Sequence, residues 1–333
     1  MVLAFTICSV NYLAQARTLG DSLRQTNPEY KYIIGLVDRL DVANLPDDLM
    51  PDYPMVEVDK IHIPDFQAMC DRYDITELNT AVKPFFIDYF YTTYPNVTQI
   101  IYFDPDIIVY QPLTQLNQAL DQHSILLTPH TCSPTPDWKR PNDQHHLNTG
   151  IFNLGFIGLR NDDTARQFVN WWKQRLVYEC RIDLCSGMFV DQQWVNFAPV
   201  FHDNVLIDNH PGYNVAYWNI HERYLSLNED EQWQVSDTAD KSGPLLQFFH
   251  YSGYDPYKPD NVSKYQDRYT FDERPDIKPV FELYKERLLA NNNEQYRKYP
   301  CVYIKPPKML RYRRVRKAIN LPFNQLISLL ESI

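Results

Sequence analysis

The sequence lacks the cysteine spacing of a zinc ribbon or of a disulfide scaffold. Its six cysteines are spread through 333 residues and include no Cys-x-x-Cys pair. Both classes of protein need closely spaced cysteines, so the sequence excludes them. We therefore expect reduced thiols that are mostly buried.

Long apolar runs and an excess of basic charge are also missing. No internal run approaches the ~20 apolar residues of a membrane-spanning helix. The formal net charge is −10, and such an acidic balance repels a phosphate backbone, so we expect no nucleic-acid partner. The opening apolar run over residues 2–7 is typical of a strand and not of a signal peptide or anchor. We expect a cytoplasmic protein.

Apolar spacing in the first hundred residues predicts alternating strands and helices. Residues 2–7, 32–37 and 100–103 form short apolar runs, whereas residues 12–23 and 80–94 have helical spacing. This alternation predicts an α/β fold with a mostly parallel central sheet and helices on both of its faces.

The second half of the chain changes character. Residues 147–159 hold three of the nine glycines, interleaved with apolar residues, which predicts strands that approach a ligand or contain a bulge. Asn161-Asp162-Asp163 is expected to cap a helix that ends near Cys180. Helical spacing returns over residues 280–289.

We expect one catalytic domain over residues 1–300 and a basic, amphipathic tail over residues 301–333, with a helix at its end. Basic residues beside an apolar helix favour contact with the inner face of a membrane. The alternative is a helix that packs on the domain behind a solvated basic turn. The basic residues are Lys305, Lys308, Arg311, Arg313, Arg314, Arg316 and Lys317.

Asp104-Pro105-Asp106 follows the predicted strand over residues 100–103. Side chains at positions i and i+2 of an extended segment point the same way, so both carboxylates can face one side. Pro105 disfavours a helical conformation at Asp104. Paired carboxylates repel each other unless a cation intervenes, and they suit Mg²⁺ or Mn²⁺. The alternative is a solvated turn between two strands.

Two further segments support a metal and ligand site. The apolar run over residues 245–249 ends at His250, and an imidazole beside two carboxylates would favour Mn²⁺ over Mg²⁺. Gly253 permits close approach of the backbone, and Lys258 could meet phosphate charge. Asp191-Gln192 could hold sugar hydroxyls, with a helix start as the alternative interpretation.

Six motifs occur in a fixed order over residues 2–260. They are Asn11-Tyr12, Ala81-Val82-Lys83, Asp104-Pro105-Asp106, Leu147-Asn148-Thr149-Gly150 with Phe152-Asn153-Leu154-Gly155, Asp191-Gln192, and His250-Tyr251-Ser252-Gly253. In this order they resemble the GT-A glycosyltransferases, particularly the retaining family 8 that includes glycogenin and bacterial lipooligosaccharide galactosyltransferases. Residues 250–256 are also similar to a segment of glycosyltransferases of bacterial surface polysaccharides.

The resemblance implies metal-dependent transfer of a sugar from a nucleotide sugar, with UDP favoured, to a glycan or lipid-linked glycan acceptor, with retention at the anomeric carbon. It also implies residue roles. Asp104, Asp106 and His250 would coordinate Mn²⁺ (or Mg²⁺), and Asn11 and Tyr12 would contact the nucleoside. Lys83 and Lys258, with Gly253 nearby, would face the diphosphate or the donor sugar. Asn153, Asp191 and Gln192 would line the sugar.

Within that set, Asp191 and Gln192 would be the catalytic residues, with Gln192 beneath the anomeric carbon. One departure concerns Lys258, which lies eight residues after His250 where the family has six.

Two alternative functions use the same residues. One is a nucleotide-sugar hydrolase that passes the sugar to water, and the other is an inactive protein that binds nucleotide sugars or glycans as a scaffold.

Overall fold

The structure is a computed structural model that describes residues 1–239 and 241–304. One compact unit covers Met1–Tyr303. Residues 305–333, which make up nearly all of the predicted tail, lie outside the described residues, so membrane contact by the tail stays a prediction. Among the residues that are described, no helix is both long enough and apolar enough to cross a bilayer.

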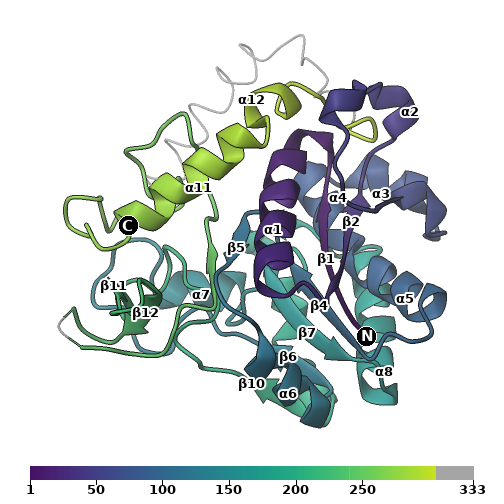
Figure 1. The fold of residues 1–333 in the computed structure, drawn as a ribbon. Helices are drawn as coiled ribbons and strands as arrows, with labels where there is room; N and C mark the ends of the chain where they lie inside the picture. Colours follow the sequence, from purple (N-terminus) through teal and green to yellow (C-terminus); the bar gives the residue numbers. More distant parts are fainter. Residues whose placement is uncertain (240, 305–333) are drawn as a thin grey trace, which may run out of the picture. The chain divides into compact units, whose positions relative to one another are not determined.

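A seven-stranded central sheet forms the core of the described unit (Figure 1). Only β7 runs antiparallel to its two neighbours, and the other pairs are parallel. The mostly parallel sheet expected from the sequence is therefore confirmed. In spatial order the strands are β10 (Val205–Ile207), β6 (Ile125–Leu127), β7 (Phe156–Arg160), β4 (Gln99–Phe103), β1 (Val2–Cys8), β2 (Lys31–Leu36) and β3 (Met55–Glu57).

Helices cover both faces of this sheet. Phe5 of β1 packs on Phe90 of α5 (Lys83–Thr93). The neighbouring residue Ala4 belongs to the buried cluster that contains Leu19 of α1 (Leu13–Thr26). Side chains of successive strand residues thus pack against the helices on opposite faces of the sheet. The helices in the described residues are α1 (Leu13–Thr26), α2 (Leu40–Ala43), α3 (Phe66–Arg72), α4 (Ile75–Ala81), α5 (Lys83–Thr93), α6 (Thr114–Gln122), α7 (Asp143–Thr149), α8 (Asp163–Leu176), α9 (Gln192–Val195), α10 (Ala198–Phe201), α11 (Lys278–Ala290) and α12 (Asn293–Tyr296).

Three small antiparallel pairs add to the central sheet. β5 (Ile107–Val109) pairs with β13 (Phe248–His250), β8 (Ile182–Asp183) with β9 (Met188–Phe189), and β11 (Tyr224–Leu227) with β12 (Trp233–Ser236). The first pair matters most for function, because it joins the end of the Asp104-Pro105-Asp106 turn to His250.

Two expectations from the sequence were wrong in detail. Residues 80–94 are not one helix, because α4 ends at Ala81 and α5 begins at Lys83. Pro84 has no amide hydrogen and fits the first turn of α5 rather than a helix interior. Residues 147–159 are not all strand either, since α7 continues to Thr149 and β7 begins only at Phe156.

Other local expectations were confirmed. The Asp162 side chain accepts a hydrogen bond from the Ala165 amide (2.9 Å) and caps α8, which ends at Leu176. Four of the six cysteines are buried.

Candidate active site

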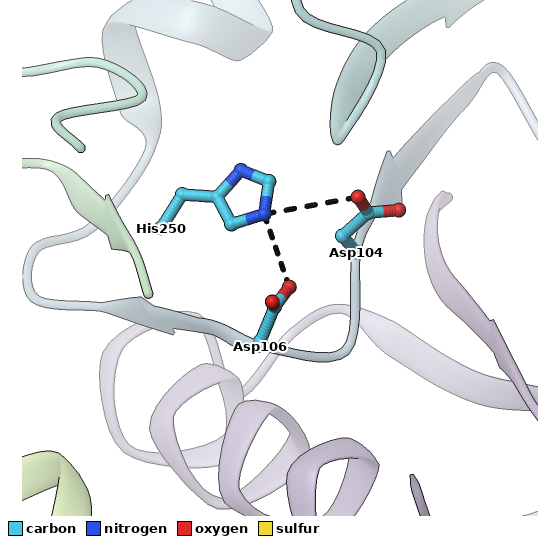
Figure 2. Close-up of side chains that lie close together, drawn as sticks. All are labelled: Asp104, Asp106 and His250. Carbon is cyan, nitrogen blue, oxygen red and sulfur yellow. Dashed lines mark ion pairs between the residues drawn. The ribbon is translucent and has the colours of Figure 1, made fainter. Parts of the chain in front are cut away.

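Backbone pairing brings His250 to the two aspartates (Figure 2). Asp104 directly follows β4 and Asp106 directly precedes β5. In the antiparallel register of β5 and β13, His250 lies opposite Ile107, the residue after Asp106. The Tyr251 amide also donates to the Asp106 carbonyl (2.8 Å). As a result, His250 Nε2 lies 3.0 Å from Asp106 Oδ1 and 3.7 Å from Asp104 Oδ2.

These three side chains fit a divalent metal. One ligand atom from each lies within 4.8 Å of the others. The His250 side chain is 3% exposed, whereas those of Asp104 and Asp106 are 34% and 21% exposed, so a ligand can approach from the carboxylate side. Two carboxylate oxygens and one imidazole nitrogen form a donor set that suits Mn²⁺. Three protein ligands also leave coordination positions for substrate oxygens.

The closeness of these three side chains and their burial shift the pKa values of His250 and Asp104. Burial lowers the pKa of His250, but the Asp106 and Asp104 carboxylates outweigh it, so the pKa is raised overall. Burial raises the pKa of Asp104, although Lys83 and His250 act in the opposite direction. A divalent cation would stabilise the ionised carboxylates, because it adds positive charge where two negative groups meet.

Gly155 and Trp218 fix the orientation of the His250 ring. A Cβ atom at residue 155 would lie 2.3 Å from His250 Cε1, so only glycine leaves room for the imidazole there. The Trp218 ring lies edge-on to the imidazole with centroids 5.1 Å apart. The ring is therefore packed from two sides.

A cavity of about 530 Å³ adjoins the two aspartates. Its walls come from the end of β1 and the start of α1, from α4, from the Asp104-Pro105-Asp106 turn, from residues 252–256, and from α11 and α12. The predicted nucleoside residues Asn11 and Tyr12 and the predicted donor residue Gly253 all line it. It lies at the carboxyl ends of the parallel strands β1 and β4, where open α/β sheets bind ligands.

The predicted sugar-binding residues form a buried group that does not line this cavity. Lys83 Nζ pairs with Asp191 Oδ2 at 2.6 Å, and both side chains are 3% exposed. Gln192 Nε2 donates to the Thr149 carbonyl (2.6 Å). Asn153 Oδ1 accepts a hydrogen bond from the Gly155 amide (3.1 Å). This bond helps to hold Gly155, against which the His250 ring packs, in place.

The structure also places Lys258 away from the cavity, and it brings in two basic residues that the sequence did not indicate. Lys258 is exposed and does not line the cavity. Lys264 and Arg297 do line it. The Lys264 amide donates to the Gly253 carbonyl (3.1 Å), so the chain after Gly253 forms a loop that returns to its own start. No spacing rule signals this return, because it depends on the closure of a ten-residue loop.

Sequence comparisons find two relatives of the chain and no matching family model. The chain is 25% identical over 283 residues to the uncharacterized protein YfnF of Bacillus subtilis (strain 168), which covers 85% of this chain and 90% of YfnF. It is 26% identical over 176 residues to the uncharacterized protein YfnD of the same strain, which covers 52% of each.

Among solved structures, the galactosyltransferase LgtC in complex with donor and acceptor sugar analogs is similar. The TM-score is 0.50 at 14% identity, and the match covers 87% of this chain and 96% of LgtC. The chain has a GT-A fold. In this GT-A fold, Asp104 and Asp106 line the cavity at the carboxyl end of β4, and the buried His250 contacts both of them.

Replacing Gly155 with alanine tests the packing around His250. The added methyl group would collide with the imidazole and displace it, so Gly155→Ala should weaken Mn²⁺ binding by about 10-fold or more, measured by calorimetry or electron paramagnetic resonance. Gly158→Ala, in β7 three residues further along the chain, is the matched control, because its methyl group would meet the end of the Leu120 side chain at 3.0 Å. Equal Mn²⁺ affinity in the two variants would contradict this role of Gly155.

Proposed function

We propose that the chain is a metal-dependent glycosyltransferase that moves a sugar from a nucleotide-sugar donor, with a UDP-sugar favoured, to a glycan or lipid-linked glycan acceptor. The observation that carries this proposal is the Asp104-Asp106-His250 group, whose two aspartates line a ligand-sized cavity at the carboxyl end of β4 in a GT-A fold. Such a group suits a cation that bridges the protein and a diphosphate.

Unpaired acceptors in the cavity support binding of a nucleoside. Within the described residues, Asn11 Oδ1, Gln15 Oε1 and Asn79 Oδ1 are buried without a hydrogen-bond partner, and all three residues line the cavity. A buried acceptor without a partner is costly. The hydroxyl groups of a ribose and the N–H groups of a base are donors that would satisfy such acceptors.

Two basic residues in the cavity support binding of the diphosphate. Lys264 and Arg297 line the cavity together with Asp104 and Asp106, so their positive charge is available to a diphosphate bound there. We assign to Lys264 the phosphate contact that the sequence resemblance implied for Lys258. Lys264 lies beside Gly253, whereas Lys258 does not line the cavity.

Cleavage of the bond between the anomeric carbon and the diphosphate builds negative charge on the leaving phosphate. Asp104, Asp106 and His250 would hold a divalent metal, which would supply the neutralising charge. The side chains of this chain would orient the reactants: we assign the leaving group to Lys264 and Arg297, which line the cavity, and to Gln192, whose side chain donates to the Thr149 carbonyl, the sugar contact that the resemblance implies.

We also propose retention of the anomeric configuration. The Asp191 carboxylate is committed to a buried pair with Lys83, which disfavours a role as covalent nucleophile. Gln192 carries an amide, which is a poor nucleophile. Retention itself is what the family resemblance implies. Without a nucleophile for a double displacement, attack on the same face as the departing diphosphate, guided by that diphosphate, is the retaining route that fits these residues.

A screen of nucleotide sugars tests the proposed function. UDP-, GDP- and CMP-sugars are incubated with the protein and Mn²⁺, and release of nucleotide is measured by chromatography. At least one UDP-sugar should be hydrolysed slowly, and hydrolysis should fall by ~100-fold or more with EDTA or in Asp106→Asn, since each removes charge stabilisation of the leaving group. Once an acceptor is found, NMR of the product anomer tests retention.

Two outcomes of this screen would count against the proposal. Undiminished hydrolysis by Asp106→Asn would contradict the metal assignment. Metal-dependent binding of nucleotide sugars without turnover, even with added acceptors, would instead favour a binding scaffold, and turnover that never reaches an added acceptor would favour a hydrolase.

The assignment of Lys264 is tested against Lys258 as a matched control. Both lysines are exposed, so neither substitution should affect folding. Lys264→Ala should raise KM for the donor by about 10-fold or more, because a charge-assisted contact with phosphate is lost. Lys258→Ala should leave KM unchanged. The reverse pattern would restore the assignment that the sequence resemblance implied.

A further inference from the structure

A second cavity, of about 390 Å³, is separate from the cavity at the two aspartates. Among the described residues, the two cavities share no lining residue. The walls of the second one come from the loop after β6, the loop after β10, the segment directly before β11 and the residue after β12. Ligand pockets of proteins typically measure ~300–1,000 Å³, so this cavity is large enough for a small ligand. The proposed transfer reaction uses none of its side chains.

His221 lines this cavity with unsatisfied ring nitrogens. Its side chain is 3% exposed. Both nitrogens are buried without a hydrogen bond of good geometry to the described part of the chain, although backbone groups of Ser133 and Trp218 lie near the ring. Burial lowers the pKa of His221, against the effect of the Glu222 carboxylate, so the ring is neutral near pH 7. A neutral imidazole has one donor and one acceptor, and a ligand hydroxyl would satisfy either of them.

Arg223 adds hydrogen-bond donors to the same cavity. This buried side chain donates to the Tyr213 carbonyl (2.5 Å) and to Cys132 Sγ (3.8 Å), which is a weak acceptor. Its Nε lies 3.8 Å from Glu222 Oε1, too far for a hydrogen bond. A guanidinium group has five N–H donors. Arg223 therefore has donors left for the oxygen atoms of a ligand.

The charges around the cavity favour an uncharged ligand. Glu222 is partly buried and accepts a hydrogen bond from the Cys132 amide (2.8 Å). Asp237 is 72% exposed and pairs with Lys241 at 3.3 Å. An anion in the cavity would meet the Glu222 carboxylate, whereas a cation would meet the Arg223 guanidinium. Each hydroxyl of a sugar both donates and accepts, so a sugar suits a wall that combines carboxylates, a guanidinium and a neutral imidazole.

Two short segments connect this cavity to the proposed metal ligands. The Trp218 ring lies edge-on to the His250 ring, and His221 follows Trp218 by three residues. An extended chain spans at most ~3.6 Å per residue, so the Cα atoms of Trp218 and His221 lie within ~11 Å of each other. The His130 ring also packs edge-on against Trp218, with centroids 5.3 Å apart, and Cys132 follows two residues later.

We propose that the second cavity is a carbohydrate subsite, which holds an uncharged sugar unit of the acceptor other than the unit that receives the transferred sugar. The assignment of this ligand to the acceptor rests on the proposed glycosyltransferase function. His221, Glu222 and Arg223 then select the acceptor by a sugar unit that takes no part in the reaction. A glycan that extends from the metal site past Trp218 reaches this subsite.

Binding of the full chain to an array of neutral and anionic glycans, without nucleotide or metal, tests the inference. At least one neutral oligosaccharide should bind, and calorimetry then gives its affinity. His221→Phe keeps an aromatic ring but removes both nitrogens, so this affinity should fall about 5-fold or more. His202→Phe is the matched control and should keep the affinity. His202 Nε2 is also buried without a partner in the described residues, but His202 packs on Phe168 and does not line the cavity.

Three results would overturn the inference: no glycan binding, binding of anionic glycans alone, or equal affinity in folded His221→Phe. Should His221→Phe not fold, Asp237→Ala takes its place, because this exposed side chain lines the cavity and its loss should weaken binding about 3-fold or more. Mn²⁺-dependent release of UDP should be unchanged in all these variants. Absence of nucleotide release by the wild-type chain would contradict the proposed function instead, and glycan binding that depends on His221 would still establish the second site.

Discussion

The antiparallel pairing of β5 with β13 is the contact on which the candidate site depends. These strands are only three residues long and are about 140 residues apart in the sequence, yet their register sets His250 beside Asp106. Successive side chains of a strand point to opposite sides, so a slip of one residue would turn His250 away from the carboxylates. The cluster around Phe103 and Phe248 holds this pairing, since their rings pack 5.5 Å apart.

A second constraint is electrostatic. Lys83 and Asp191 are buried, and each alone would be an uncompensated charge in the interior. Removing one partner of such a pair typically costs about 3–5 kcal/mol of folding free energy, so the two residues stabilise the fold only together. Through Tyr102, the pair is also tied to Asp104. Folding stability and the shape of the proposed donor site therefore depend on the same residues.

Much of this arrangement could be predicted from local sequence. The strand over residues 2–7 and the one ending before Asp104 have clear apolar runs, and the i, i+2 spacing of the aspartates needs no tertiary information. The break between α4 and α5 was less apparent, because helical apolar spacing continues across Val82 although Pro84 begins a new first turn. The preference of Pro84 for the first turn of a helix therefore had more effect on the structure than the continuous apolar spacing.

The remainder depends on contacts between distant segments. The return of the chain from Gly253 to Lys264 is closed by the Lys264 amide on the Gly253 carbonyl and by the Ser263 hydroxyl on the Ser252 carbonyl. Arg297, directly after α12, lines the cavity. The commitment of Asp191 to Lys83 joins residues 108 positions apart. None of these has a signature in residue spacing, which is why the sequence indicated Lys258 for the phosphate.

The central claim is that Asp104, Asp106 and His250 hold a metal against a nucleotide diphosphate. Calorimetric titration of UDP into the protein, with Mn²⁺ and then with EDTA, tests it most directly. Mn²⁺ should tighten UDP binding by ~10-fold or more, and this gain should disappear in Asp106→Asn. Equal UDP affinity with and without the metal would contradict it.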